Sequence, residues 1–501
     1  MALVINTNIS SLNAQRNVNR TNMSLETSIQ RLSTGLRINS AKDDAAGLGI
    51  IDRMTSQVRG LNQAVRNAND AVSISQTAEG AMQESTNILQ RMRELAVQSA
   101  NDSNSGADRV NIQKEISQLS SELNRIASQT TFNGKNILDG TFTAAQFQVG
   151  ANANETIAVT LGNFSASSMG AYQSTSILNV GAISAATDAD TNNVVGDTLT
   201  VTGAAASDVT YANDATAAEI AAAFQAVSDT TEVTATASTS VDIKYATGVA
   251  VGETVSFELS AVDGSAVAQG GVANISYTLT STTDYAGLRD AINAETNSTG
   301  ITATLNSSAG TLTLANADGH NIFINAVSNG TADDAVLDVG ATATTFTSSA
   351  TLTNDTTTAA NTDAISVGGQ VSLSGSSGFS VTGTVPTFAA ADLNATLSSI
   401  ADVDVSTRAG SNNALEVIDK ALRTVSDSRA DLGAIQNRLE YTISNLSNVS
   451  ENVSAARSRI QDTDFASETA NLTRNQILQQ AGIAMLSQAN KAPQAVLALL
   501  Q

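Results

Sequence analysis

The residue types that most often carry out catalysis or bind metal ions are scarce in this chain. Its single histidine, His320, lies in the turn-like stretch Asn316–Asn321, without a second histidine nearby and without an HExxH pattern. Cysteine is absent, which excludes a thiolate nucleophile, a cysteine metal site and a disulfide. The aspartates of the middle lack EF-hand spacing, so we interpret them as turn residues. We therefore predict that the protein is not an enzyme and has no catalytic residues, metal or cofactor.

Charge is distributed unevenly along the chain. The formal net charge is -22, and residues 141–400 hold 23 of the 47 acidic residues but two of the 25 basic ones, Lys244 and Arg289. Such an acidic surface repels nucleic acid, anionic membranes and other copies of itself. We expect no nucleic-acid partner, and we expect the balanced ends of the chain to pack against one another.

The N-terminus resembles neither a signal peptide nor a membrane anchor. Its first residues lack a positive region followed by an apolar one, and no apolar run long enough to span a bilayer occurs in the chain. We expect no membrane insertion, and no export through a cleaved Sec signal peptide.

The N-terminal end has helical periodicity. Apolar residues at 25, 29, 32 and 36 predict a first helix that ends between Gly35 and Asn39. Ser40 and Asp43 resemble a capping box at the start of a long second helix, and a third helix is expected from about 107 to 128. We call the apolar stripe of each helix its seam. The seam residues of the first helix are Leu25, Ile29, Leu32 and Leu36, and those of the second are Met54, Val58, Leu61 and Val65.

The C-terminal end also has helical periodicity, with the long helix first and the shorter terminal helix last. A heptad seam, interrupted by Thr442, predicts coiled-coil packing, and a polar break at 461–464 separates it from a last amphipathic segment. The seam consists of Ile435, Leu439, Leu446, Val449, Val453 and Ile460, and the last segment carries Leu478, Met485, Val496 and Leu499. Because both seams lie at the chain ends, we expect the ends to form one bundle from which the middle loops out.

Thr, Ser, Val, Gly and Asp dominate the middle, a composition that favours strands and turns. Before it, Asn133-Gly134 and Asp139-Gly140 indicate turns of a small β element. Inside it, 215–247 and 274–326 repeat a strand, short helix and strand pattern. The predicted fold is multidomain, with a terminal α-helical coiled-coil bundle formed by both ends and an inserted β-rich (α+β) variable middle.

Several motifs in the two ends, taken together, resemble bacterial flagellin. They are Ile5-Asn-Thr-Asn8, Arg31-Leu-Ser-Thr-Gly-Leu-Arg-Ile-Asn-Ser-Ala-Lys-Asp-Asp-Ala-Ala-Gly47, Arg66-Asn-Ala-Asn-Asp70, Arg93-Glu-Leu-Ala-Val-Gln-Ser-Ala-Asn101, Thr131-Phe-Asn-Gly134 and Ile460-Gln-Asp-Thr-Asp-Phe465. The resemblance implies a structural subunit that polymerises through both termini into the extracellular flagellar filament, the propeller of motility.

The resemblance also implies three parts of the chain. Residues 1–42 and 460–501 would form the inner tube, 43–175 and 405–459 the helical outer tube with a small β element, and 176–404 the exposed variable domain. Leu25, Ile29, Leu32, Leu36, Leu478, Met485, Val496 and Leu499 would then be polymerisation seams, and the other seam residues the bundle core.

Partners follow from the same resemblance. They are other copies of the chain, a flagellar export chaperone at the C-terminal helix, the filament cap and hook-junction proteins, with secretion through the flagellar type III apparatus. Recognition by host Toll-like receptor 5 would involve Gln90, Arg91, Leu95 and Glu115, although Arg91 and Glu115 also fit ordinary solvated helix charges. Two alternatives stay open, a hook-filament junction protein with similar ends and an acidic surface adhesin.

Overall fold

The computed structural model contains two compact units, which are described here separately. Unit 1 comprises Met1–Glu79, Phe142–Leu161 and Ala430–Gln501, and unit 2 comprises Gly80–Thr141 and Gly162–Arg429. The structure describes residues 7–179, 184–185, 194–246, 249–265, 267–281, 283, 285–306, 309–329, 335–340, 348–353, 364–383 and 393–499. Residues 5 and 6 of the first flagellin-like motif lie outside these ranges.

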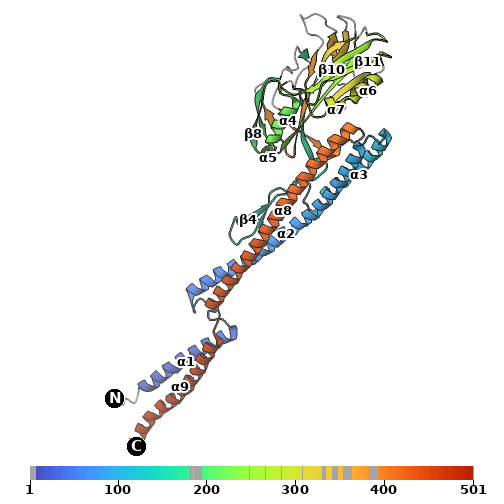
Figure 1. Ribbon diagram of the computed structural model, residues 1–501. Coiled ribbons are helices and arrows are strands. Elements are labelled where there is room, and N and C mark those ends of the chain that lie inside the picture. The colour runs from blue at the N-terminus through green and yellow to red at the C-terminus, as the bar shows by residue number, and fades with distance from the viewer. Residues whose placement is uncertain are drawn as a thin grey trace. The chain divides into compact units, whose positions relative to one another are not determined.

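In unit 1 the two ends of the chain form an antiparallel helix pair, α1 (Ile9–Thr34) and α9 (Phe465–Leu499) (Figure 1). The Asn8 side chain caps α1 by accepting a hydrogen bond from the Ser11 N–H. Gly35 ends α1 in the left-handed region, with φ +72°, and donates its N–H to the Arg31 carbonyl. The first helix therefore ends where the sequence predicts.

The rest of unit 1 combines parts of two long helices, α2 (Ala45–Ala100) and α8 (Arg408–Gln461), with a hairpin of β3 (Ala145–Gln148) and β4 (Thr156–Val159). One buried cluster joins all three through Ala68, Ala71, Val149, Ile157 and Leu439. A second cluster contains Leu61, Ala64 and Leu446. The two ends of the chain thus share a core, as the paired seams predict.

The start of α2 differs from the sequence prediction. The predicted capping box at Ser40 was wrong, because α2 begins at Ala45 and its Gly47 N–H donates to the Asp44 carboxylate at 2.8 Å. The Asp43 carboxylate instead accepts from the N–H groups of Asn39 and Ser40 in the preceding turn.

The seam of α8 also runs differently at one position. Ile443, rather than Thr442, packs against the cluster around Leu439. The Thr442 hydroxyl donates to the Arg438 carbonyl of its own helix at 2.8 Å. The seam is therefore continuous and contains no polar break at this point.

In unit 2 the helical part consists of α3 (Gly106–Gln129) with the adjoining parts of α2 and α8. Ser105 and Asp108 form a capping box at the start of α3. Buried Met82, Leu89 and Leu123 belong to its interior. The hairpin of β1 (Thr131–Phe132) and β2 (Lys135–Asn136) follows, with its turn at the predicted Asn133-Gly134.

The β-rich part of unit 2, called the insertion below, spans 170–399 and contains antiparallel sheets in the described residues. One sheet has the order β11-β10-β14-β17-β6, another β12-β13-β9-β18-β5-β21 with β15 and β16 beside β9, and a third β20-β19-β7-β8. The strands are β5 (Gly170–Asn179), β6 (Ser184–Ala185), β7 (Asp197–Thr202), β8 (Ala206–Tyr211), β9 (Val233–Tyr245), β10 (Thr254–Val262), β11 (Ala273–Thr278), β12 (Ile301–Asn306), β13 (Thr311–Asn316), β14 (Asn321–Ser328), β15 (Ala335–Gly340), β16 (Ser348–Thr353), β17 (Ile365–Val367), β18 (Gln370–Gly375), β19 (Ser380–Thr382), β20 (Leu393–Asn394) and β21 (Thr396–Ser399).

Short helices cover these sheets. They are α4 (Ala217–Ala226), α5 (Ser228–Thr231), α6 (Ala286–Ala294) and α7 (Thr296–Thr299), and a 3-10 turn, Ile400–Asp402, leads towards α8. One buried cluster includes Phe257, Leu288 and Ile324, and another includes Phe224, Val201 and Leu373. The fold is the predicted one, in which long terminal helices pack together and a β-rich middle is inserted between them.

Candidate assembly surface

Three side-chain hydrogen bonds join α1 and its flanking Asn8 to α9 in unit 1. The Asn8 side chain donates to the Ala489 carbonyl, the Ser11 hydroxyl to Asn490, and the Gln479 amide to Asn22, each at 2.8 Å. Among the described side chains of the two helices, the buried ones are Ser28 and Glu468, and both are polar. Apolar side chains on the inner side of the pair, such as Leu25 and Leu32, are therefore half-buried at most.

The apolar side chains of the pair are largely exposed instead. Ile29 is 52% exposed and Met485 64% exposed in the isolated chain. The exposed set contains Ile9, Leu12, Met23, Ile29, Phe465, Ile477, Leu478, Ile483 and Met485, and we call it the terminal apolar face. Apolar side chains repeated along both helices mark a surface for protein–protein contact.

The predicted polymerisation seam belongs in part to this face. Ile29, Leu478 and Met485 are exposed, whereas Leu25, Leu32 and Leu36 are half-buried. Val496 and Leu499 lie in α9, but their side chains fall outside the described part of the structure. The sequence reasoning missed the exposed members outside its stripes, such as Leu12 and Phe465, because periodicity alone does not show which stripe stays uncovered.

The predicted bundle-core residues lie on α2 and α8. Val58, Leu61, Leu439 and Leu446 are buried. Met54, Val65, Ile435, Val449, Val453 and Ile460 are half-buried. Their partial exposure leaves apolar area on this helix pair that a second chain can cover.

The four residues proposed for receptor contact lie in unit 2. Gln90, Arg91 and Glu115 are exposed, but Leu95 is 2% exposed and faces the interior. The Arg91 guanidinium bonds Glu115 across two helices at 2.9 Å, and this bond raises the pKa of Arg91 with a smaller contribution from Glu94. The three polar residues are thus accessible, whereas Leu95 is buried and offers no surface for receptor contact in the isolated chain.

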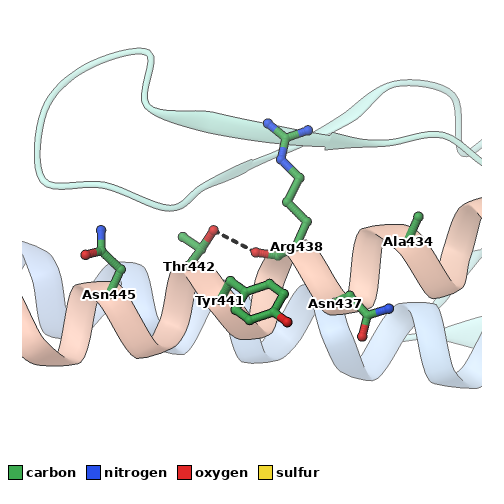
Figure 2. A pocket seen from close by; sticks show the side chains of 6 residues that line it. All are labelled: Ala434, Asn437, Arg438, Tyr441, Thr442 and Asn445. Atoms are coloured by element: carbon green, nitrogen blue, oxygen red, sulfur yellow. Dashed lines mark hydrogen bonds between the residues drawn. The ribbon is translucent and has the colours of Figure 1, made fainter.

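A shallow depression on α8 in unit 1 was not expected from the sequence. It is lined by Ala434, Asn437, Arg438, Tyr441, Thr442 and Asn445, all from one face of α8 (Figure 2). Tyr441 is 79% exposed, which is unusual for a large aromatic side chain. The lining contains one basic group and no carboxylate, so it offers a contact surface rather than an acid–base pair.

Among the described residues, no group of three or more His, Cys, Asp or Glu side chains could hold a metal ion. None of the described helices is both long enough and apolar enough to cross a membrane. His320 is half-buried, and its backbone N–H donates to the Asn316 side chain.

Paired helices from both chain ends, with exposed apolar side chains on α1 and α9, are typical of a structural subunit that packs against other copies. Family models for the bacterial flagellin N-terminal helical region, the bacterial flagellin C-terminal helical region and the flagellin hook IN motif match residues 5–143, 415–500 and 256–318. The B-type flagellin of Pseudomonas aeruginosa is 45% identical over 516 residues, which cover 100% of both chains. The chain belongs to the bacterial flagellin family, which is a family of structural proteins.

Solved structures give more distant likenesses. FliC from Burkholderia pseudomallei is 23% identical, with a TM-score of 0.28, over 74% of this chain and 99% of that one. The flagellar junction protein FlgL from Legionella pneumophila is 14% identical, with a TM-score of 0.31, over 83% and 100%. At these TM-scores neither structure supports the family assignment. The assignment rests on the flagellin relative that matches the full length of the chain, and this match disfavours the junction-protein alternative.

Proposed function

We propose that copies of this chain polymerise into the flagellar filament through the terminal apolar face of α1 and α9. The observation that carries the proposal is the exposure of apolar side chains along two helices that completely bury no apolar side chain among those the structure describes. Burying about 1,000 Å² or more of such surface is typical of stable protein interfaces. Repeated head-to-tail contact along a screw axis produces an open filament.

Within this proposal, the three-part division of the chain keeps its predicted bounds. Residues 1–42 and 460–501 form the inner tube, 43–175 and 405–459 the outer tube, and 176–404 the exposed domain. The half-buried seam of α2 and α8, together with Tyr441, supports the outer-tube role because it leaves apolar and aromatic area for a neighbouring copy. We assign the chain no catalytic role.

Further partners belong to the same proposal. An export chaperone would cover α9 before secretion through the flagellar type III apparatus, because the apolar side chains of that helix need shielding from other copies. Cap and hook-junction proteins would contact the same termini at the two filament ends. In a host, Toll-like receptor 5 would contact Gln90, Arg91 and Glu115, which are accessible in the isolated chain.

The test is seeded polymerisation of purified chain, followed by light scattering and electron microscopy. Ile29→Asp and Met485→Asp place charges on the terminal apolar face and should abolish filament growth. Val267→Asp is the matched control, because Val267 is 55% exposed but lies in the insertion. Growth of both terminal variants at the normal rate would overturn the proposal. A chain lacking 1–40 and 460–501 should also fail to grow.

A further inference from the structure

The insertion contains the same supersecondary unit twice. The first repeat comprises β8, α4, α5 and β9, and the second comprises β11, α6, α7 and β12. Equivalent core positions are filled by Ile220 and Leu288 and by Phe224 and Ile292, all of which are buried. The hook IN motif match at 256–318 contains the second repeat. Each repeat therefore serves as an internal reference for the other.

The two repeats also share the turn that leads into the last strand. The Thr231 hydroxyl donates to the Val227 carbonyl at 3.0 Å, and the Thr299 hydroxyl donates to the Glu295 carbonyl at the same distance. The next residue is left-handed in both, with φ 58° and ψ 15° at Glu232 and φ 68° and ψ 7° at Gly300. The two repeats thus have the same backbone conformation at this turn, including the left-handed residue.

The side chain at the left-handed position is where the repeats differ. Glycine adopts this conformation at little cost, as at Gly300, whereas a side chain with a Cβ is strained there. The first repeat nevertheless has Glu232. A glutamate at a position that suits glycine indicates that its side chain makes a compensating contact.

That contact is part of a polar surface at one end of the sheet. Gln173, Ser374 and Thr234 lie directly opposite one another on β5, β18 and β9, so they share one face, and we call them the polar row. The Glu232 carboxylate, beside this row, accepts from the Ser376 hydroxyl at 3.2 Å. The second repeat has no such row, since Thr302 lies opposite Ala315.

Helix α8 presents two charged side chains, one turn apart, to the polar row. The Lys420 amine donates to the Thr234 hydroxyl at 3.0 Å, and the Glu416 carboxylate accepts from the Gln173 amide at 3.3 Å. Burial lowers the pKa of Lys420. Glu416 and Glu232 oppose that shift, whereas Arg423 adds to it. Lys420 therefore bonds Thr234, two residues after Glu232 in the insertion, while Glu416 of the same helix bonds Gln173.

We propose that Glu232, Lys420 and the polar row form a latch that fixes the orientation of the insertion on helix α8. The latch positions the insertion relative to the part of α8 that belongs to the same unit, and it acts within one chain. It is therefore independent of polymerisation and is testable on the monomer. Glu232 is a positioning residue in this proposal, because it acts through Lys420 and Ser376.

Because the chain contains no cysteine, a spin label attaches only to cysteines that are introduced for a distance measurement. Val110→Cys on α3 and Val267→Cys in the insertion, both at exposed positions, provide unique sites for spin labels. Pulsed dipolar spectroscopy should give a narrow distance distribution for the chain with an intact latch. Glu232→Gly and Lys420→Met should each broaden it, and the double variant should be no broader than either single variant.

Two further variants separate the latch from general effects. Glu232→Asn tolerates the left-handed conformation without the freedom of glycine and should broaden the distribution as much as Glu232→Gly. Asp229→Asn removes a charge at a nearby exposed position and should leave the distribution narrow. Glu232→Gly should not lower the midpoint of thermal unfolding, because it relieves backbone strain. Narrow distributions for both Glu232 variants, or equal broadening by Asp229→Asn, would overturn the proposal.

Discussion

The α1–α9 pair and the insertion differ in how far they bury their apolar side chains. The insertion encloses Phe224, Phe257 and their neighbours in buried clusters, so its folding free energy comes from its own interior. The helix pair leaves Ile29, Met23 and Met485 in solvent. Helices in proteins gain most of their stability from packing, and under the proposed function other chains supply much of that packing to this pair. The comparison separates a region that is complete by itself from one that becomes complete by assembly.

The largest expected effect contrasts one buried and one exposed apolar residue. Phe224→Ala creates a cavity in the insertion and should lower the free energy of unfolding by about 3–5 kcal/mol. Ile29→Ala should change monomer stability by less than about 0.5 kcal/mol. Urea unfolding followed by circular dichroism measures both. In seeded growth assays the order should reverse, with Ile29→Ala slowing polymerisation and Phe224→Ala leaving it intact. A large stability loss from Ile29→Ala would remove the contrast.

A smaller effect is expected at a helix cap inside the insertion. The Thr216 hydroxyl accepts from the Glu219 N–H, and the Glu219 carboxylate accepts from the Thr216 N–H, so that α4 begins with a capping box. Thr216→Ala should lower the free energy of unfolding of the insertion by about 1 kcal/mol. Urea denaturation with Thr216→Ser as the conservative control measures this. An equal loss in the serine variant would show that the methyl group, rather than the hydroxyl, matters.

The smallest effect concerns the cap of α3 and depends on pH. The Ser105 hydroxyl and backbone N–H donate to Asp108 and lower the pKa of its carboxyl. Because the folded-state pKa lies below the unfolded one, the stabilisation is complete above the unfolded pKa and disappears as pH falls through the folded one. The chain should be more stable than Asp108→Asn near neutral pH. Thermal unfolding across acidic pH should show the difference vanishing, and a constant difference would contradict the assignment.

The helical ends were predictable from sequence because burial in long helices follows a fixed period. The spacing of Leu25 to Leu36 and of Ile435 to Ile460 located α1 and α8. The errors were local. Asp44 competes with Ser40 for the N-cap, and a one-residue shift placed Thr442 in the seam instead of Ile443. Both alternatives satisfy the same pattern, and only three-dimensional packing distinguishes them.

The candidate sites were less predictable, for a physical reason. The inward orientation of Leu95 and the exposure of Leu12 depend on which faces of neighbouring helices meet. The contact between Lys420 and Thr234 joins residues 186 positions apart, and neither belongs to a recognisable motif. Strands rich in Ser, Thr and Val give little positional information, because these residues fit either face of a sheet. The sequence indicated a repeat at 215–247 and 274–326, but the first range omits β8, and it did not show the role proposed for Glu232.

The two strands that bound the insertion are hydrogen-bonded neighbours. Gly170 at the start of β5 lies opposite Ser399 at the end of β21, so the chain leaves the helical region and returns to it at points about 5 Å apart. A domain of almost any length fits between these two residues when its own N- and C-termini lie equally close together. Because the two ends of the insertion lie side by side, the outer domain can change in length and fold while the terminal helices stay the same.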